Sequence, residues 1–473
     1  MKFVSTIFLA VIMTLTIFFP NTANAAPVPL RGIVEGFYGK PWTAADREDI
    51  MNFCREHNLN AYIYAPKDDP YHRDKWREPY PADKLAELQR LVTVAKSNGI
   101  RFTFAISPGL DLHYNGSDGE KDFNLLLQKM DTVYKIGVRS FAIFFDDLKD
   151  DKGRHHEDGK KQAEFINRLQ DTFHTMHKDI VPLMTVPTEY FYLDMVDGNK
   201  IKSYTRDFAE TIDEKVIVLY TGDGVVCDGI TNSQFHAANK IYNRELGIWW
   251  NYPVNDYTMH SNKIKRPAKL ALGAIEKLPT ENMLAIFCNP MEQAQLSKIA
   301  LATGGEYANA PTIYNPQSSW NKVIDELFGD LAPAMKIFAS HSQHMENSWA
   351  KCGPADAPQF ASSANILLLN IRKGRTADFT TLESYIAEME NAADTLLTRL
   401  PQKYLVECKP QLEQFKRIAQ ADRLAVNSLK AGKLDPKLNT LRAEIERHAP
   451  TAILSELSAL KFIDDVLALM KKA

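Results

Sequence analysis

The 473-residue chain has little of several features that mark common classes of protein. Its formal net charge is −3, so it lacks the basic excess that favours a nucleic-acid partner. Its five cysteines match no zinc-ligand spacing, and its histidines do not stand at metal-ligand spacing either. No Gly-x-Gly-x-x-Gly turn, internal repeat or low-complexity tract is evident. We therefore expect neither a nucleic-acid partner nor a metal site.

The few cysteines also bear on disulfide bonding. Cys54, Cys227 and Cys288 lie in apolar segments, and we interpret them as small buried hydrophobic residues. Cys352 and Cys408 are the two candidates for a disulfide, which an oxidising compartment would permit. The sequence leaves this pairing open.

An apolar run stands at the N-terminus. Lys2 precedes an uncharged stretch from Phe3 to Phe19, and Ala23-Asn-Ala25 places small residues where a signal peptidase reads them. We predict that residues 1–25 are a bacterial-type signal peptide, and that the mature chain is secreted or periplasmic without stable membrane insertion. An uncleaved membrane anchor is the alternative, because the 17-residue run is at the lower limit for a span.

Between about residues 30 and 305, short apolar runs alternate with longer amphipathic stretches. The runs are rich in Ile, Val, Phe and Tyr and nearly continuous in apolarity, which is typical of strands buried on both faces. Eight strands are predicted, at Gly32–Gly36, Ala61–Ala65, Phe102–Ser107, Ser140–Phe145, Pro182–Val186, Val216–Tyr220, Gly247–Asn251 and Met283–Cys288. Eight strand–helix units predict an α/β fold, a (β/α)8 TIM barrel over residues 28–305, with a doubly wound open sheet as the alternative.

The pattern changes after the eighth unit. Residues 306–319 form a connector that contains Pro and Asn, and no convincing strand follows it. Residues 320–473 are predicted to be an all-α C-terminal domain of antiparallel helices. The amphipathic stretches are Trp320–Phe328, Met335–Met345, Phe379–Leu400, Tyr404–Ala431 and Thr440–Lys472. This domain is a candidate for packing near the barrel mouth or for forming a homodimer, and the sequence does not decide between them.

The sharpest chemical feature is a pair of adjacent carboxylates, Asp146 and Asp147, directly after the apolar run Phe141–Phe145. Catalytic groups of a TIM barrel stand at the C-terminal ends of its strands. Two close carboxylates cannot both ionise cheaply in a partly desolvated site, so one pKa is expected to be raised, as glycosidases require. A solvated acidic loop and a metal site are the alternatives.

Other polar and aromatic residues also fall at predicted strand ends. A barrel mouth lined in this way suits a sugar, whose hydroxyls need polar partners and whose ring face stacks on aromatic side chains. These strand-end residues include Gly36, Tyr38, Lys67, Tyr190, Thr221, Trp249, Asn251, Asp256 and Asn289.

Six of these stretches together resemble glycoside hydrolase family 84, which includes protein O-GlcNAcases and bacterial β-N-acetylglucosaminidases. They occur in family order and cover the whole predicted barrel. The stretches are Val34-Glu-Gly-Phe-Tyr-Gly-Lys-Pro-Trp42, Tyr64-Ala-Pro-Lys-Asp-Asp69, Phe145-Asp-Asp-Leu148, Val186-Pro-Thr-Glu-Tyr190, Trp249-Trp-Asn-Tyr-Pro-Val-Asn-Asp-Tyr257 and Asn289-Pro-Met291.

The resemblance implies a role for each site residue. Asp146 is expected to orient and polarise the acetamide N–H of the substrate, Asp147 to act as general acid and then base, and Tyr190 to steady the acetamide oxygen. Contacts to the sugar hydroxyls are expected from Gly36, Lys67, Asn251, Asp256 and Asn289. The walls of the acetamide pocket are expected from Tyr38, Thr221 and Trp249, with Val186 close by.

The resemblance further implies a retaining exo-β-N-acetylglucosaminidase that uses the substrate's own acetamide as nucleophile and forms an oxazoline intermediate. An intramolecular attack gains a large effective molarity. Asp147 would start protonated and therefore carry the higher pKa. The expected partner is a GlcNAc-terminated glycan or glycoprotein, and no metal or organic cofactor is expected. A non-catalytic sugar-binding barrel is one alternative, and a glycosidase with a protein nucleophile such as Glu35 or Glu189 is another.

Overall fold

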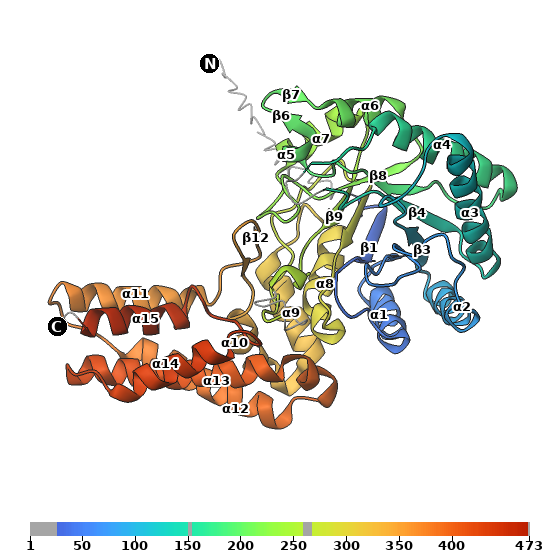
Figure 1. Cartoon of the computed structure of the whole chain (residues 1–473). Helices are drawn as coiled ribbons and strands as arrows, with labels where there is room; N and C mark the ends of the chain where they lie inside the picture. Colours follow the sequence, from blue (N-terminus) through green and yellow to red (C-terminus); the bar gives the residue numbers. More distant parts are fainter. Residues whose placement is uncertain (1–25, 150–153, 259–266, 472–473) are drawn as a thin grey trace, which may run out of the picture.

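The computed structural model describes residues 26–149, 154–258 and 267–471 (Figure 1). The predicted signal peptide, residues 1–25, lies outside the described residues. Within the described ranges, no helix combines the length and the apolar composition that crossing a membrane requires.

Eight parallel strands close into a barrel, as predicted (Figure 1). Their order around the barrel is β1-β10-β9-β8-β5-β4-β3-β2, so the first and last strands pair with each other. Each predicted strand is confirmed to within two residues at either end. The strands are β1 Leu30–Glu35, β2 Ala61–Tyr64, β3 Arg101–Ile106, β4 Ser140–Phe144, β5 Met184–Val186, β8 Ile217–Tyr220, β9 Gly247–Trp250 and β10 Ala285–Cys288.

The strands are apolar throughout because alternate side chains pack into two different hydrophobic cores. Val34, Ile63 and Phe144 belong to a cluster that fills the barrel interior. Ile33 and Ile143, each the neighbour of an inward-facing residue, belong to the larger cluster between the strands and the surrounding helices. Successive residues of a strand point to opposite faces, so both faces of each strand are buried.

Seven longer helices accompany the strands around the barrel. The described residues between β9 and β10 are instead irregular, with one 3-10 helix, η1 Asp256–Thr258. The segment between β5 and α6 contains the short helix α5 Tyr192–Met195 and a two-stranded sheet formed by β6 Val196–Asp197 and β7 Lys200–Ile201. The longer helices are α1 Ala44–Glu56, α2 Ala82–Ser97, α3 Gly116–Lys135, α4 Gly159–Met176, α6 Ser203–Thr211, α7 Asn232–Tyr242 and α8 Ala294–Asn309.

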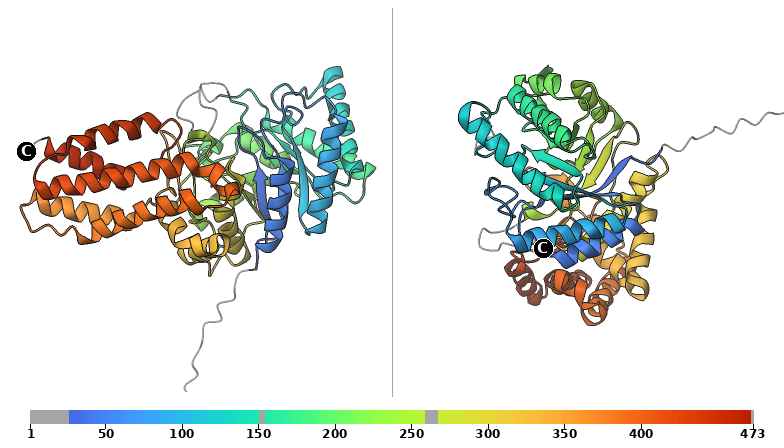
Figure 2. Two further views of the ribbon diagram at one scale, coloured as in Figure 1. Left: turned by 90° about the horizontal axis from the view of Figure 1, so that it is seen from below. Right: turned by 90° about the vertical axis from the view of Figure 1, so that its right-hand side faces the viewer.

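The C-terminal part is helical, as predicted, and forms an elongated bundle to one side of the barrel (Figures 1 and 2). The longest helix, α13, packs against α12, α14 and α15 along its length. The helices are α9 Pro316–Phe328, α10 Ala332–Ser340, α11 Pro358–Arg372, α12 Thr380–Arg399, α13 Gln402–Ala431, α14 Pro436–His448 and α15 Ala459–Met470, with the 3-10 helix η2 Gly329–Leu331 before α10.

Three details of this region differ from the sequence-based expectation. Helix α11 was not expected, and the single stretch Thr440–Lys472 is two helices, since Pro450 cannot continue α14. The expectation that no strand follows residue 320 is wrong. Met345–Glu346 (β11) and Lys351–Cys352 (β12) form an antiparallel hairpin whose strands are too short to show an alternating pattern.

The expected connector, residues 306–319, overlaps the end of α8 and the start of α9, and the domain boundaries remain predictions.

All five cysteines are free thiols, so the candidate pairing of Cys352 with Cys408 is wrong. The two sulfur atoms have different surroundings. Cys352 Sγ lies 3.3 Å from the hydroxyl of Tyr257, whereas Cys408 Sγ donates to the carbonyl of Tyr404 within α13, at 3.3 Å.

A carboxylate of the helical bundle caps the N-terminus of one of the barrel helices. Helix α8 has no side-chain cap of its own at its N-terminus. Glu407 of α13 accepts the backbone N–H groups of Gln295 at 3.0 Å and Leu296 at 2.9 Å. A carboxylate at this position satisfies N–H groups that have no partner within the helix, and it complements the positive end of the helix dipole.

We predict that Glu407→Ala lowers the stability of the barrel as well as that of the bundle. The expected loss is about 1–2 kcal/mol, because two N–H groups lose their acceptor. Thermal unfolding followed by circular dichroism measures it as a lower Tm. Glu413→Ala on the same helix is the matched control, and an unchanged Tm for Glu407→Ala would contradict the capping role.

Candidate active site

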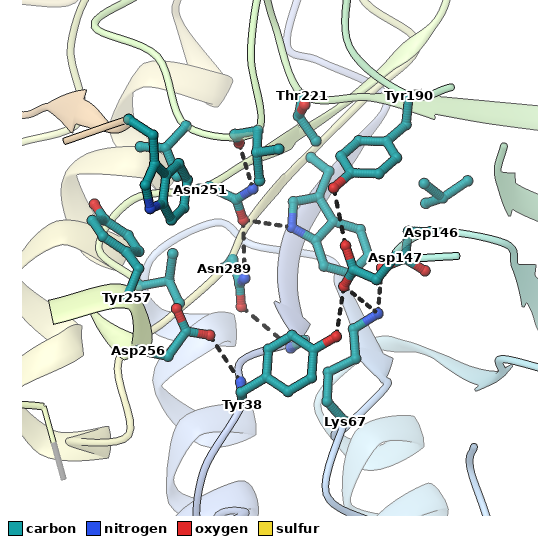
Figure 3. A pocket seen from close by; sticks show the side chains of 17 residues that line it. Tyr38, Lys67, Asp146, Asp147, Tyr190, Thr221, Asn251, Asp256, Tyr257 and Asn289 are labelled. Carbon is teal, nitrogen blue, oxygen red and sulfur yellow. Dashed lines mark hydrogen bonds and ion pairs between the residues drawn. The ribbon is translucent and has the colours of Figure 1, made fainter. Parts of the chain in front are cut away.

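A cavity of about 480 Å³ opens at the C-terminal ends of the barrel strands, and all twelve residues expected from the sequence line it (Figure 3). They come from the C-terminal ends of seven strands and the loops that follow them, which is how TIM barrels assemble a site. The twelve are Gly36, Tyr38, Lys67, Asp146, Asp147, Val186, Tyr190, Thr221, Trp249, Asn251, Asp256 and Asn289. The structure thus places these residues together, and their chemical roles are taken up below as a proposal.

Sequence reasoning missed five further lining residues. Val225, Val226, Val254 and Tyr257 lie beside expected residues on the same loops, so proximity in sequence was a usable signal. Trp349 gave no such signal, because it lies in the turn between β11 and β12, about a hundred residues beyond Asn251 along the chain. Its ring is 5.4 Å from that of Tyr257 and 58% of its surface is exposed. A hairpin beyond the barrel therefore contributes to the cavity rim.

A buried ion pair occupies one side of the cavity. Lys67, in the loop after β2, binds Oδ2 of Asp146, in the loop after β4 (Figure 3). Its Nζ also lies 3.8 Å from Oδ2 of Asp147. The other oxygen of Asp146, Oδ1, is buried and has no hydrogen-bond partner among the described residues. A buried carboxylate oxygen without a donor costs about 1–3 kcal/mol, so this atom is a ready acceptor for a ligand N–H or O–H.

Asp147 is held in an unusual conformation by donors from two other loops. Its φ is 58°, in the left-handed region. Oδ2 accepts the hydroxyl of Tyr38 at 2.6 Å, and Oδ1 accepts that of Tyr190 at 3.1 Å. A left-handed aspartate is uncommon and persists only where surrounding contacts determine it, which is frequent at functional sites.

The pKa of Asp147 is lowered, which contradicts the expectation that this residue carries the higher pKa. Burial acts to raise the pKa, but the charge of Lys67, the Tyr38 hydrogen bond, the charge of Arg73 and the Tyr190 hydrogen bond together outweigh it. These groups stabilise the carboxylate. The sequence-based argument considered only the neighbouring carboxylate and could not include donors from distant loops.

The raised pKa belongs to Asp256, in η1 on the opposite wall of the cavity. Burial raises the pKa of this carboxyl to about 6, and hydrogen bonds from the backbone N–H groups of Tyr38 and Tyr257 offset only part of that increase. Oδ2 of Asp256 accepts the N–H of Tyr38 at 2.9 Å. The nearby charge of Asp147 also raises the pKa of Asp256, so the two carboxylates influence each other across the cavity.

Two asparagine side chains form the third part of the site (Figure 3). Asn289 accepts the N–H of Gly36 at 3.2 Å and donates to Oδ1 of Asn251 at 3.0 Å. Asn251 Oδ1 also accepts the indole N–H of Trp249 at 2.8 Å, while its Nδ2 donates to the carbonyl of Val225 at 2.7 Å. The orientations of both amides are therefore fixed before any ligand binds, as an accurate polar site requires.

The position of Trp249 explains why residue 36 is a glycine. A Cβ atom at Gly36 would lie 2.4 Å from the indole ring of Trp249, which is itself buried. The ring of Trp249 also packs edge-on against Phe144 of β4, with 5.4 Å between ring centroids. The aromatic wall is therefore held from both the barrel interior and the loop after β1.

The carboxylates considered as alternative nucleophiles do not reach the cavity. Glu35 is fully buried and is bound by Arg47 and by the hydroxyl of Tyr62. Glu189 accepts the hydroxyl of Thr205 at 2.5 Å and lies 3.1 Å from a ring nitrogen of His155. Both serve to hold structure, and neither lines the cavity.

Comparison with known families agrees with this site. A family model described as beta-N-acetylglucosaminidase matches residues 31–340, and a model described as hyaluronidase post-catalytic domain-like matches residues 365–463. The chain belongs to the beta-N-acetylglucosaminidase family, glycoside hydrolase family 84. The resemblance drawn from the sequence motifs is thereby confirmed.

Two curated relatives are the protein O-GlcNAcases of Rattus norvegicus and Mus musculus. The rat protein is 31% identical over 289 residues, which is 60% of this chain and 30% of the relative. The mouse protein is 31% identical over 299 residues, covering 60% of this chain and 31% of the relative. The chain thus spans about a third of the length of these relatives.

Solved structures extend the similarity to the helical bundle. The structure of CpGH84B superposes with a TM-score of 0.84 at 34% identity, covering 93% of this chain and 77% of the other. A variant of the Thermobaculum terrenum O-GlcNAc hydrolase superposes with a TM-score of 0.78 at 29% identity, covering 93% of this chain and 94% of the other. Barrel and bundle together therefore correspond to an arrangement seen in these proteins.

The raised pKa of Asp256 predicts a pH-dependent cost to stability. A carboxyl whose pKa is raised on folding binds its proton more tightly in the folded state, so ionisation destabilises the fold as the pH rises from about 4 through about 6. Asp256→Asn should therefore raise stability at pH 7.5, by on the order of 1–2 kcal/mol, and have little effect at pH 4.

Thermal unfolding of wild type and Asp256→Asn at the two pH values measures this difference. Asp171→Asn, on the exposed face of α4, is the matched control. A change in Tm that is the same at both pH values would show that the carboxyl of Asp256 has an ordinary pKa.

Proposed function

We propose that this chain hydrolyses terminal β-linked N-acetylglucosamine with retention of configuration, using the acetamide of the substrate as nucleophile. The observation that carries the proposal is Asp146. Lys67 binds one of its carboxylate oxygens, and the other is buried without a hydrogen-bond donor among the residues described. An acetamide N–H would supply that donor. The carboxylate would also stabilise the positive charge that develops on the amide nitrogen as its carbonyl oxygen attacks the anomeric carbon.

In this proposal Asp147 protonates the leaving group and then activates water against the oxazoline intermediate. The ligand-free arrangement favours its carboxylate form, which is the form that the second step needs. For the first step the residue must be protonated. We infer that bound substrate raises its pKa, since a sugar displaces water from around a carboxyl that is already two-thirds covered.

Tyr190 complements this pair. Its hydroxyl donates to Asp147, and burial raises the pKa of the phenol well above its ordinary value, so it remains a neutral donor. A neutral hydroxyl at this position can steady the acetamide oxygen in the intermediate. Val186, Thr221 and Trp249 would enclose the methyl group, and Thr221 has its own hydroxyl satisfied by the carbonyl of Gly224 at 2.8 Å.

The opposite wall supports recognition of the sugar itself. Asn251, Asn289 and Asp256 present amide and carboxylate groups, and the volume of about 480 Å³ lies in the range of small-molecule sites. These features support an exo-acting enzyme that holds one terminal sugar. The names of the relatives support an O-GlcNAc-type substrate, a glycoprotein or another glycan that ends in the same sugar.

A protein nucleophile is the competing mechanism. Two-carboxylate retaining enzymes place their carboxyl groups about 5–5.5 Å apart on opposite faces of the scissile bond. Asp146 and Asp147 are adjacent at one strand end, and the carboxylate across the cavity, Asp256, has a raised pKa. Oδ2 of Asp256 already accepts the backbone N–H of Tyr38 at 2.9 Å, whereas Oδ1 of Asp146 is buried with no donor among the described residues. The substrate-assisted mechanism, in which the acetamide N–H supplies that donor, therefore fits the geometry better.

The acetamide requirement tests the mechanism. Wild-type protein should cleave 4-nitrophenyl β-N-acetylglucosaminide and leave 4-nitrophenyl β-glucoside essentially intact, because the glucoside lacks the nucleophile. Comparable rates on both substrates would assign the nucleophile to the protein.

Substitutions at the two aspartates test their separate roles. Asp147→Asn should lower kcat by about 10²–10⁴-fold through loss of acid–base catalysis. Asp146→Asn should lower it by about 10²–10³-fold through loss of charge stabilisation. Asp111→Asn, beyond β3 and outside the cavity lining, is the matched control and should retain activity. Retained activity in either cavity variant would remove that residue from the mechanism.

We also propose that the enzyme acts outside the cytoplasm, in the periplasm or beyond the cell. The support is the sequence pattern of residues 1–25. Expression of the full chain in a bacterium followed by intact mass measurement of the exported protein should give a chain that begins at Ala26. A mass that retains Met1 would instead support the uncleaved anchor.

A further inference from the structure

Arg73 lies behind the cavity, and the sequence motifs gave it no role. It stands in the loop between β2 and α2, half-buried, and does not line the cavity. Its Nη1 donates to the hydroxyl oxygen of Tyr38 at 2.7 Å, and its Nη2 donates to the backbone carbonyl of Asp147 at 3.3 Å. One guanidinium thus binds both the side chain that contacts the proposed acid and the backbone that carries that acid.

The neighbouring residue fixes this loop. His72 is fully buried, and its Nδ1 lies 2.8 Å from the carbonyl of Ala105 in β3. Its Nε2 lies 3.2 Å from the hydroxyl of Ser107, whose own N–H donates to the carbonyl of His72 at 2.9 Å. Burial lowers the pKa of His72 to about 3, so the ring stays neutral and the anchor does not change with physiological pH. Arg73 is therefore presented from a rigid support.

The chemistry of the groups fixes the direction of the hydrogen bonds. A guanidinium has donors and no acceptor, so the Tyr38 oxygen must accept from Arg73. A phenol has one proton, and the partner 2.6 Å away is Oδ2 of Asp147. The Tyr38 proton is thereby committed to Asp147. Without Arg73, the hydroxyl would be free to turn and accept a hydrogen bond from the protonated acid instead.

Resting on the proposed function, we propose that Arg73 is a positioning residue for the reaction, which orients the Tyr38 hydroxyl proton toward Asp147 and holds the backbone of Asp147 in its left-handed conformation. It keeps the acid–base residue in the carboxylate form until substrate binds. The other charged or titratable groups that face Asp147 are Lys67 and Tyr190, whose charge and hydrogen bond favour the carboxylate, and the carboxylates of Asp146 and Asp256, which oppose it.

The first test is the pH profile of kcat/KM on phenyl β-N-acetylglucosaminide, whose poor leaving group depends on the acid. The alkaline limb reports the pKa of the protonated acid in the free enzyme. Arg73→Met should move this limb upward by about 0.5–1 unit, and Arg73→Lys, which keeps the charge, by less than about half of that. Because Asp147 also loses its backbone anchor, kcat should fall by about tenfold in Arg73→Met while KM stays within about twofold.

Tyr38→Phe provides the matched background, because it removes the hydroxyl through which Arg73 acts. In that background Arg73→Met should shift the alkaline limb by less than half as much as in wild type. An unmoved limb in a folded Arg73→Met protein would overturn the proposal. Equal shifts of the alkaline limb in Arg73→Met and Arg73→Lys would also overturn it. An Arg73→Met shift in the Tyr38→Phe background as large as that in wild type would do the same.

A second measurement does not depend on activity, so it separates this proposal from the proposed function. A carboxyl with a lowered pKa stabilises the fold above its unfolded pKa of about 3.9, and this stabilisation is lost as the pH falls through the folded value. Asp147→Asn should therefore lower Tm at pH 7 more than at pH 3, and this pH-dependent difference should shrink in the Arg73→Met background. If the difference is the same in both backgrounds, Arg73 does not control the protonation of Asp147, whether or not the protein cleaves the sugar.

Discussion

Lys67 and Asp146 form a buried ion pair where the loops after β2 and β4 meet, and the chemistry of the cavity depends on it. The ammonium holds one oxygen of Asp146 and leaves the other for a ligand, and its charge also favours the carboxylate of Asp147. Loss of one partner from such a pair leaves an uncompensated buried charge. The barrel makes the pair possible, because parallel strands deliver loops that are far apart in sequence to one end of the fold.

Much of this was predictable from the sequence, for reasons that lie in the strands. A strand buried on both faces reads as a continuous apolar run, so Phe141–Phe145 was recognisable and the next residues had to emerge at the barrel mouth. The same reasoning applied to the other strand ends, and it identified eleven residues that line one cavity, where Val186, expected from the family resemblance, joins them. Spacing alone did not give their roles, which came from the resemblance of the motifs to a known family.

What the sequence did not reveal depends on contacts between distant segments. The pKa of Asp147 is set by Lys67, Tyr38, Arg73 and Tyr190, which lie on three other loops, and its neighbour in sequence is not the deciding influence. Trp349 reaches the cavity from a hairpin whose two-residue strands carry no periodic signal. Likewise the cap that Glu407 gives to α8 joins two parts of the chain that the sequence treats as separate. Local patterns identify elements, whereas these features arise only when the elements are assembled.

The central claim is that the acetamide of the substrate, held by Asp146, is the nucleophile. Its most direct test is the rate of cleavage of 4-nitrophenyl glycosides whose N-acetyl group carries none, one, two or three fluorine atoms. Fluorine withdraws electrons from the amide oxygen and weakens it as a nucleophile while changing its size little. The account predicts that kcat falls steeply with each added fluorine. Rates that do not depend on the number of fluorine atoms would contradict it and would place the nucleophile on the protein.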